Sequence, residues 1–158
     1  MYKTAVPIKC KTLQEAKEYY PSMKSAGVER VWMCGFGKIL EYEPQKSDAL
    51  VQEPKKAVDF FRENGLEVGL WVGGFGHGEG LTHETEKKAH AKNYTKLTGL
   101  RGVGNEYGLC PKDPEYAADF ARGIATLAAS GPVMIMLDDD FRLNGRPAYD
   151  IGCFCDAH

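Results

Sequence analysis

Segments patterned like buried strands alternate with segments patterned like helices along most of this 158-residue chain. Alternation of this kind is typical of parallel sheets built from right-handed β-α-β units. Between the third strand and the last helix, residues 79–111 are expected to be irregular, with a charged, helix-like piece around residues 84–92. The predicted strands are residues 4–9, 28–34, 66–72 and 133–137, and the predicted helices are residues 12–26, 55–64 and 111–129.

Local signals set the ends of the first two helices. Thr12 and Glu15 have the spacing of a capping box, and Gly27 follows the first helix as a stop signal. Pro54 fits the first turn of the second helix, where its missing N–H is not needed. The sequence therefore predicts a loop from Gly35 to about residue 52.

The third strand distinguishes between two architectures. One of its faces carries Glu67, Gly69 and Trp71, whereas the other is aliphatic throughout. Both faces of a small doubly wound (flavodoxin-like) sheet meet helices and should look alike. The asymmetry favours the four-stranded parallel half of a (β/α)8 (TIM-type) barrel, whose strands would follow one another in the order 1-2-3-4. Because a complete barrel needs about 250 residues, residues 1–158 are expected to form a single α/β domain, a truncated TIM-barrel catalytic domain.

The sequence VMIMLDDDFR at residues 133–142 places three carboxylates and an arginine directly after an apolar strand. Ligands of parallel α/β folds bind at the carboxyl ends of the strands. Strand alternation puts Asp138 and Asp140 on the interior face, and Asp139 would point outward, toward Arg142 or the N-terminus of a helix. Paired carboxylates facing a pocket are the usual apparatus of glycoside hydrolysis. We expect Asp138 and Asp140 to be catalytic and Asp139 and Arg142 to bind substrate, with a further acid supplied by another strand.

A glycine-rich segment, GGFGHG at residues 73–78, follows the third strand. It lacks the Lys and Ser/Thr of a phosphate-binding loop, so a nucleotide site is not predicted. Its glycines would let the backbone pass close to a ligand that Trp71 and His77 face. Trp71 would stack on the apolar side of a sugar ring, with a place in the core as the alternative.

The sequence GCFCDAH at residues 152–158 brings Cys153, Cys155 and His158 within six residues. Thiolate and imidazole ligands suit Zn²⁺, so these three residues are a candidate metal site. A fourth ligand would come from elsewhere, and Cys110 and Cys34 are other thiols to consider. The alternative is that the thiols are buried and incidental. No other cofactor is expected.

Composition narrows the range of partners and compartments. The formal charge of −2 gives no reason to expect nucleic acid or an anionic membrane as a partner. No apolar run approaches the roughly 20 residues that span a bilayer. Five irregularly spaced cysteines argue against a disulfide framework and for a reducing, cytoplasmic home, with a removed secretion signal as the alternative. Because a half barrel leaves open strand edges, we expect a homodimer or a missing C-terminal half.

Three motifs carry a resemblance to a known family. The sequences CPKDPEY at residues 110–116, LDDDFR at 137–142 and GCFC at 152–155 resemble the N-terminal half of large bacterial glycoside-hydrolase-like (β/α)8 barrel proteins. Such proteins are similar to β-galactosidase-type and related glycosidases, whose catalytic acids lie at strand ends. The resemblance implies a carbohydrate ligand and a fragment of a glycoside hydrolase, with Asp138 and Asp140 at the matching positions. The alternatives are a non-catalytic carbohydrate-binding half barrel and a metal-dependent hydrolase.

Overall fold

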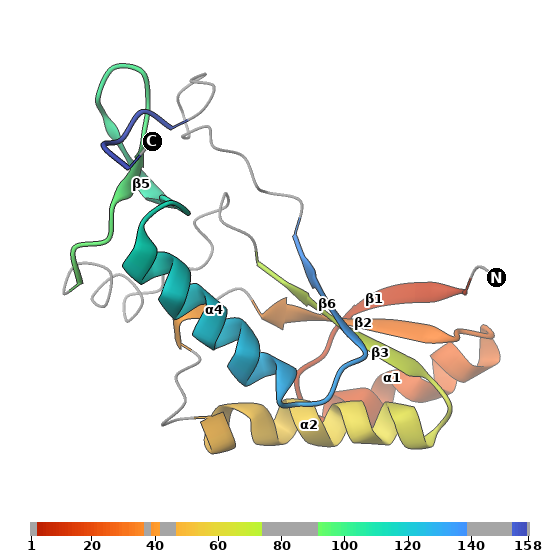
Figure 1. The fold of residues 1–158 in the computed structure, drawn as a ribbon. Coiled ribbons are helices and arrows are strands. Elements are labelled where there is room, and N and C mark those ends of the chain that lie inside the picture. The colour runs from red at the N-terminus through yellow and green to blue at the C-terminus, as the bar shows by residue number, and fades with distance from the viewer. Residues whose placement is uncertain (1–2, 37–38, 42–46, 74–91, 139–152, 158) are drawn as a thin grey trace. The chain divides into compact units, whose positions relative to one another are not determined.

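The computed structural model describes residues 3–36, 39–41, 47–73, 92–138 and 153–157 (Figure 1). The chain divides into two compact units. We call them the sheet unit, which comprises Met1–Phe36, Tyr42–Val72 and Ile124–Leu137, and the hairpin unit, which comprises Gly37–Glu41, Gly73–Gly123 and Asp138–His158. Among the described residues, no helix is both long and apolar enough to cross a membrane.

A four-stranded parallel sheet forms the centre of the sheet unit. Its strands are β1 (Ala5–Lys9), β2 (Arg30–Phe36), β3 (Glu67–Val72) and β6 (Met134–Leu137), in the spatial order β1-β2-β3-β6. This is the strand order predicted for a partial (β/α)8 barrel. It rules out the doubly wound alternative, in which the first strand would lie between two others.

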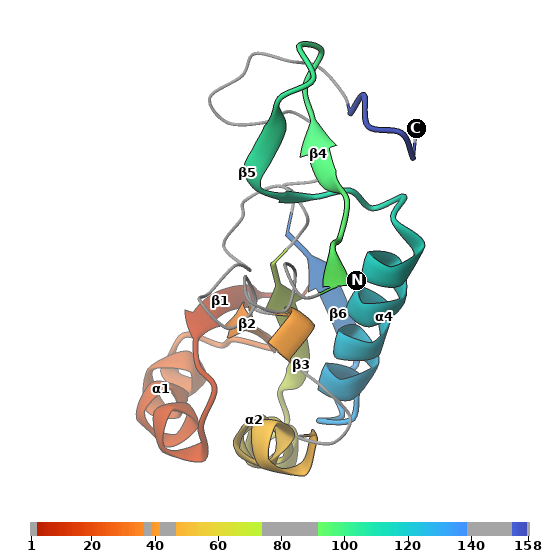
Figure 2. The same cartoon turned by 90° about the vertical axis from the view of Figure 1, so that its left-hand side faces the viewer.

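Two helices cover one face of this sheet. Helices α1 (Leu13–Ser25) and α2 (Ser47–Glu63) pack against each other on the same side, as right-handed crossovers between neighbouring strands require (Figures 1 and 2). The predicted capping box is present, because the Glu15 N–H donates to Thr12 Oγ1 at 3.2 Å and the Thr12 N–H donates to a Glu15 carboxylate oxygen at 3.0 Å. Gly27 follows α1 with a φ of 67°, which confirms the predicted stop.

The predicted start of α2 is wrong. The helix begins at Ser47, so Pro54 lies inside it and not in its first turn. Pro54 belongs to a buried stripe with Val51, Val58 and Phe61 at helical spacing. Burial of that stripe offsets the cost of the backbone hydrogen bond that a proline cannot donate.

The two faces of the sheet differ as the sequence predicted. The helix-covered face is fully buried at five positions, Val31, Met33, Val68, Leu70 and Val72. On the opposite face, the register pairs Trp32 with Gly69 and Trp71 with Met136. A Cβ atom at Gly69 would lie 2.4 Å from Cζ3 of Trp32, so only glycine leaves room for this indole ring. We call this opposite side of the sheet the tryptophan face.

The hairpin unit contains an antiparallel pair that the sequence did not predict. Strands β4 (Lys96–Thr98) and β5 (Gly104–Leu109) lie within the stretch expected to be irregular. The described part of the expected helix-like piece, Lys92, is helical, and residues 84–91 lie outside the described residues.

Helix α4 (Pro114–Ala128) follows the hairpin and leads toward β6. Asp113 caps its start, because its carboxylate accepts the N–H of Tyr116 and the N–H of Thr95, each at 2.8 Å. Farther along α4, the buried carboxylate of Asp119 is paired with Lys92 at 2.7 Å and with Arg122. These contacts fix the start of α4 beside the β4–β5 hairpin.

Candidate functional site

The predicted sugar-site residues are described only in part. Trp71 is the penultimate residue of β3, and Asp138 directly follows β6. Asp139, Asp140, Arg142 and His77 lie outside the described residues, so their predicted roles stay predictions.

The pairing of β3 with β6 shows where Trp71 and Asp138 lie relative to the sheet. Trp71 is opposite Met136, and residues in register on parallel strands project to the same face. Trp71 is half-buried on the tryptophan face, near the carboxyl end of the sheet. Asp138 is two residues beyond Met136 and is also half-buried. Asp138 is therefore the first polar residue after the apolar strand β6, at the carboxyl edge of the sheet.

A lysine that sequence reasoning overlooked lies at the same edge. The Lys11 ammonium lies 5.7 Å from the centroid of the Phe36 ring, a cation–π distance that joins the segment after β1 to the end of β2. Gly35 makes room for it, with a φ of 104° and a position where a Cβ atom would lie 2.8 Å from Lys11 Cε. The available signal was simply that Lys11 follows a strand end, where ligands of such folds bind.

The opposite edge of the sheet carries a carboxylate with a different role. Glu67, at the start of β3, accepts hydrogen bonds from Lys3 and from the Arg30 guanidinium, the latter at 2.6 and 3.0 Å. The hydrogen bond from Lys3, which has the larger effect, and those from Arg30 hold the pKa of Glu67 below its ordinary value, although desolvation acts to raise it. A carboxylate that stays ionised at the amino edge of the sheet fits an ion pair that supports the fold better than an acid catalyst.

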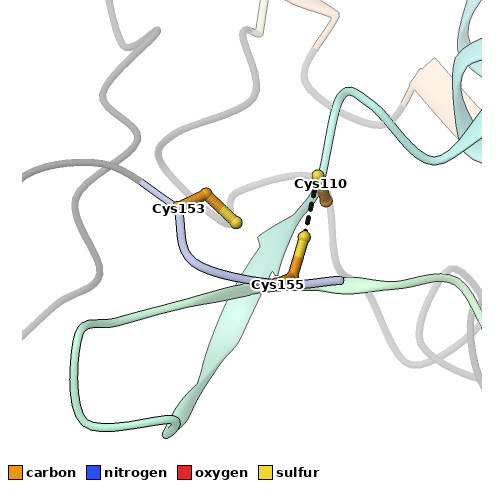
Figure 3. A group of neighbouring side chains, drawn as sticks. All are labelled: Cys110, Cys153 and Cys155. Atoms are coloured by element: carbon orange, nitrogen blue, oxygen red, sulfur yellow. Dashed lines mark hydrogen bonds between the residues drawn. The ribbon is translucent and has the colours of Figure 1, made fainter. Parts of the chain in front are cut away.

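Three thiols form a second cluster, which lies within the hairpin unit. The Sγ atoms of Cys110, Cys153 and Cys155 all lie within 4.8 Å of one another, and those of Cys110 and Cys155 are 3.5 Å apart (Figure 3). Cys110 directly follows β5, and the other two come from the C-terminal segment. The three sulfur atoms are close enough together to bind a single metal ion.

Two of the three metal ligands predicted from the sequence therefore lie together in the structure. Cys153 and Cys155 are in the cluster, and Cys110 joins them from a distant part of the chain. His158 lies outside the described residues. Cys34, the other thiol considered, is on β2 in the sheet unit and is not part of the cluster. Local spacing alone did not identify Cys110 as a ligand.

Burial and hydrogen bonding act in opposite directions on these thiols. Desolvation raises the pKa of Cys110 to about 11. Burial also disfavours the thiolate of Cys153, but the backbone N–H groups of Thr98 and Cys155 and the two neighbouring thiols outweigh it, so the pKa of Cys153 is lowered. The Thr98 N–H lies 3.3 Å from Cys153 Sγ, which makes Cys153 the thiol best prepared to carry a negative charge.

A solved glycoside hydrolase has a similar fold. The chain is similar to a GH31 α-xylosidase from a soil metagenome, solved in complex with xylose, with a TM-score of 0.53 and 17% identity. The match covers 92% of this chain but only 22% of that enzyme. No protein-family model and no curated protein matches the chain. At this identity the similarity shows the fold, a partial α/β barrel.

Proposed function

We propose that this chain is part of a glycoside-hydrolase-like catalytic domain that binds a carbohydrate at the carboxyl edge of its parallel sheet. The observation that carries the proposal is the pairing of Trp71 with Met136 on the tryptophan face, two residues before Asp138. This arrangement supplies an aromatic surface near a strand end from which a carboxylate-rich segment begins. Sugar recognition needs both elements, since rings present apolar faces to aromatics and hydroxyl groups to acids.

The residues would divide the work by their chemistry. Trp71 would stack on the sugar ring, and Asp138 or Asp140 would serve as acid/base or accept a hydrogen bond from the 2-hydroxyl group. Arg142 would adjust the charge of the acids, Asp139 would contribute to substrate binding, and His77 would complete the subsite. A second catalytic acid would come from another strand. The chain spans about a fifth of the α-xylosidase to which it is similar. Hydrolysis of a glycosidic bond is therefore a proposal and does not follow from that similarity.

Tryptophan fluorescence provides a direct binding test, because the chain has only two tryptophans. In Trp32→Phe the remaining indole is that of Trp71, and in Trp71→Phe it is that of Trp32. We expect a panel of xylose, glucose, galactose and their short β- and α-linked oligomers to include a sugar that changes the emission of Trp32→Phe. The same sugar should bind Trp71→Phe roughly fivefold more weakly, since exchanging the indole for the smaller phenyl ring costs on the order of 1 kcal/mol of stacking. Equal affinities of the two variants would contradict the proposed place of the site.

Turnover separates the catalytic proposal from the non-catalytic alternative. Chromogenic aryl glycosides of the bound sugar should be hydrolysed by the wild-type chain or by the longer protein that contains it. Asp138→Asn and Asp140→Asn keep the side-chain size, and we expect one of them to lose about 10²- to 10⁴-fold in rate while still binding sugar. Binding without turnover in the longer protein would instead favour a carbohydrate-binding half barrel.

A further inference from the structure

The thiol cluster joins two parts of the chain that are far apart in sequence. Cys110 ends the β4–β5 hairpin, and its N–H donates to the Thr95 carbonyl oxygen at 2.8 Å. The C-terminal segment lies beside the same hairpin, because the Phe154 N–H donates to the Thr98 carbonyl oxygen at 2.8 Å. The buried side chains of Leu97, Cys110 and Cys153 form a small core there, against which Cys155 packs. The backbone thus positions all three sulfur atoms before any ligand is added.

We propose that Cys110, Cys153 and Cys155 bind one Zn²⁺ ion as thiolates, in a structural site that fastens the C-terminal segment to the β4–β5 hairpin. The Zn²⁺ ion displaces the thiol protons to solvent, and no oxidation is involved. This site is separate from the sugar site and does not depend on the proposed hydrolysis.

The sulfur spacing fits a tetrahedral zinc site. Zn–S bonds of about 2.3 Å at tetrahedral angles place neighbouring sulfur atoms about 3.8 Å apart. The observed separations, 3.5 Å for Cys110 and Cys155 and no more than 4.8 Å within the group, lie around that value. A disulfide would need about 2.05 Å. It would also leave the third thiol of the cluster unpaired.

The chemistry of the donors selects the metal. Thiolates are soft ligands that favour zinc over magnesium or calcium, both of which prefer oxygen. The N–H of Thr98 points to Cys153 Sγ, and such backbone donors to a ligand atom orient it and stabilise its charge. His158 follows Cys155 by three residues, lies outside the described residues and stays a predicted ligand, one that would complete the set of four beside the three thiols.

A metal at this position would close a long loop of the chain. The segment between Cys110 and Cys153 contains α4, β6 and the three acids that follow β6. Closing a long loop removes conformational freedom from the unfolded chain, so the ion would stabilise the folded state. The proposed sugar-site carboxylates would then lie in a segment that is fixed at both ends.

Metal content is the first test. The chain is purified without metal-affinity chromatography and without chelator, and bound metals are quantified by inductively coupled plasma mass spectrometry. We expect on the order of one zinc per wild-type chain, and an equal amount in the control Cys34→Ser, whose thiol lies outside the cluster. Cys110→Ser, Cys153→Ser and Cys155→Ser should each retain about a tenth or less of that amount. Unchanged zinc in all three variants would overturn the proposal.

A second test avoids variants that fail to fold. Wild-type chain is freed of metal with a chelator under reducing conditions and titrated with Co²⁺. We expect thiolate-to-cobalt charge transfer in the near ultraviolet, visible bands typical of tetrahedral cobalt, and reversal by stoichiometric Zn²⁺. Absence of these bands would overturn the proposal, as would a Cys110–Cys155 disulfide found by mass spectrometry in metal-free chain as purified. Neither result bears on sugar binding, so this proposal and the proposed function can fail separately.

Discussion

Gly69→Ala tests whether the tryptophan face depends on a close contact between neighbouring strands. Gly69 and Trp32 are in register on β3 and β2, and the indole ring lies over the glycine. A Cβ atom at residue 69 would lie 2.4 Å from Cζ3 and 2.5 Å from Cε3 of Trp32. Carbon atoms prefer separations of about 3.5–4.0 Å, so the ring would have to move by roughly 1 Å or more.

The expected cost follows from that displacement. Overpacking of this kind typically destabilises a protein by about 1–3 kcal/mol. The methyl group also restricts the unfolded chain, which offsets about 0.4–1 kcal/mol. We therefore expect Gly69→Ala to lower the free energy of unfolding by about 1–2 kcal/mol.

Urea denaturation followed by circular dichroism measures this change. The matched control is Gly104→Ala, where the nearest atom outside the adjacent residues would be Lys96 Cβ at an ordinary 3.6 Å from the new Cβ. We expect the free energy of unfolding of this control to change by no more than about 0.5 kcal/mol. In a Trp32→Leu background the cost of Gly69→Ala should largely disappear, because the rigid ring is gone. A cost that persists in that background would refute the assigned contact.

Three further outcomes follow from the hairpin unit and the sheet. Burial opposes ionisation of Asp113, but hydrogen bonds from the N–H groups of Tyr116 and Thr95 outweigh burial and lower the pKa of Asp113. The cap therefore contributes its full stability above the ordinary aspartate pKa. That contribution is lost as the pH falls through the lowered pKa. Asp113→Ala should therefore cost about 1–2 kcal/mol at neutral pH in urea titrations, and Asp113→Asn should lose less stability on acidification than wild type does. His158→Ala should weaken zinc binding by roughly tenfold or more in competition with a chromophoric chelator, and unchanged affinity would remove His158 from the ligand set. Sedimentation at micromolar concentration should detect a homodimer, because Val133 and Met134 leave apolar surface exposed at the last strand, and a monodisperse monomer would refute this expectation.

The strand order was predictable because it depends on patterns that are local in sequence. Each strand is short and apolar, and each connection contains a helix, so right-handed crossovers leave few possible topologies. The difference between the two faces was readable from β3 alone, where Gly69 and Trp71 alternate with aliphatic residues. The same alternation also identified the face that carries Met134 and Met136.

The errors arose where tertiary contacts override local signals. Pro54 indicated a helix start, but α2 continues toward the N-terminus as far as Ser47, because Val51 and Pro54 belong to its buried stripe. The β4–β5 hairpin was missed because β4 is only three residues long and has a single buried position, Leu97. That side chain is buried by Cys110 and Cys153, which are remote in sequence. The three-thiol cluster could not be assembled from spacing for the same reason, since it requires the hairpin to be known first.

Mapping a bound sugar by ¹H–¹⁵N correlation spectra tests the proposed function most directly. The uniformly labelled chain is titrated with the sugar that changes the emission of Trp32→Phe, and shifts are assigned to residues. We predict that the largest changes fall at the carboxyl edge of the sheet, on the indole N–H of Trp71 and the backbone N–H of Asp138. Changes centred on Arg30 and Glu67 at the amino edge, or no changes with any sugar of the panel, would contradict a carbohydrate site at the carboxyl edge.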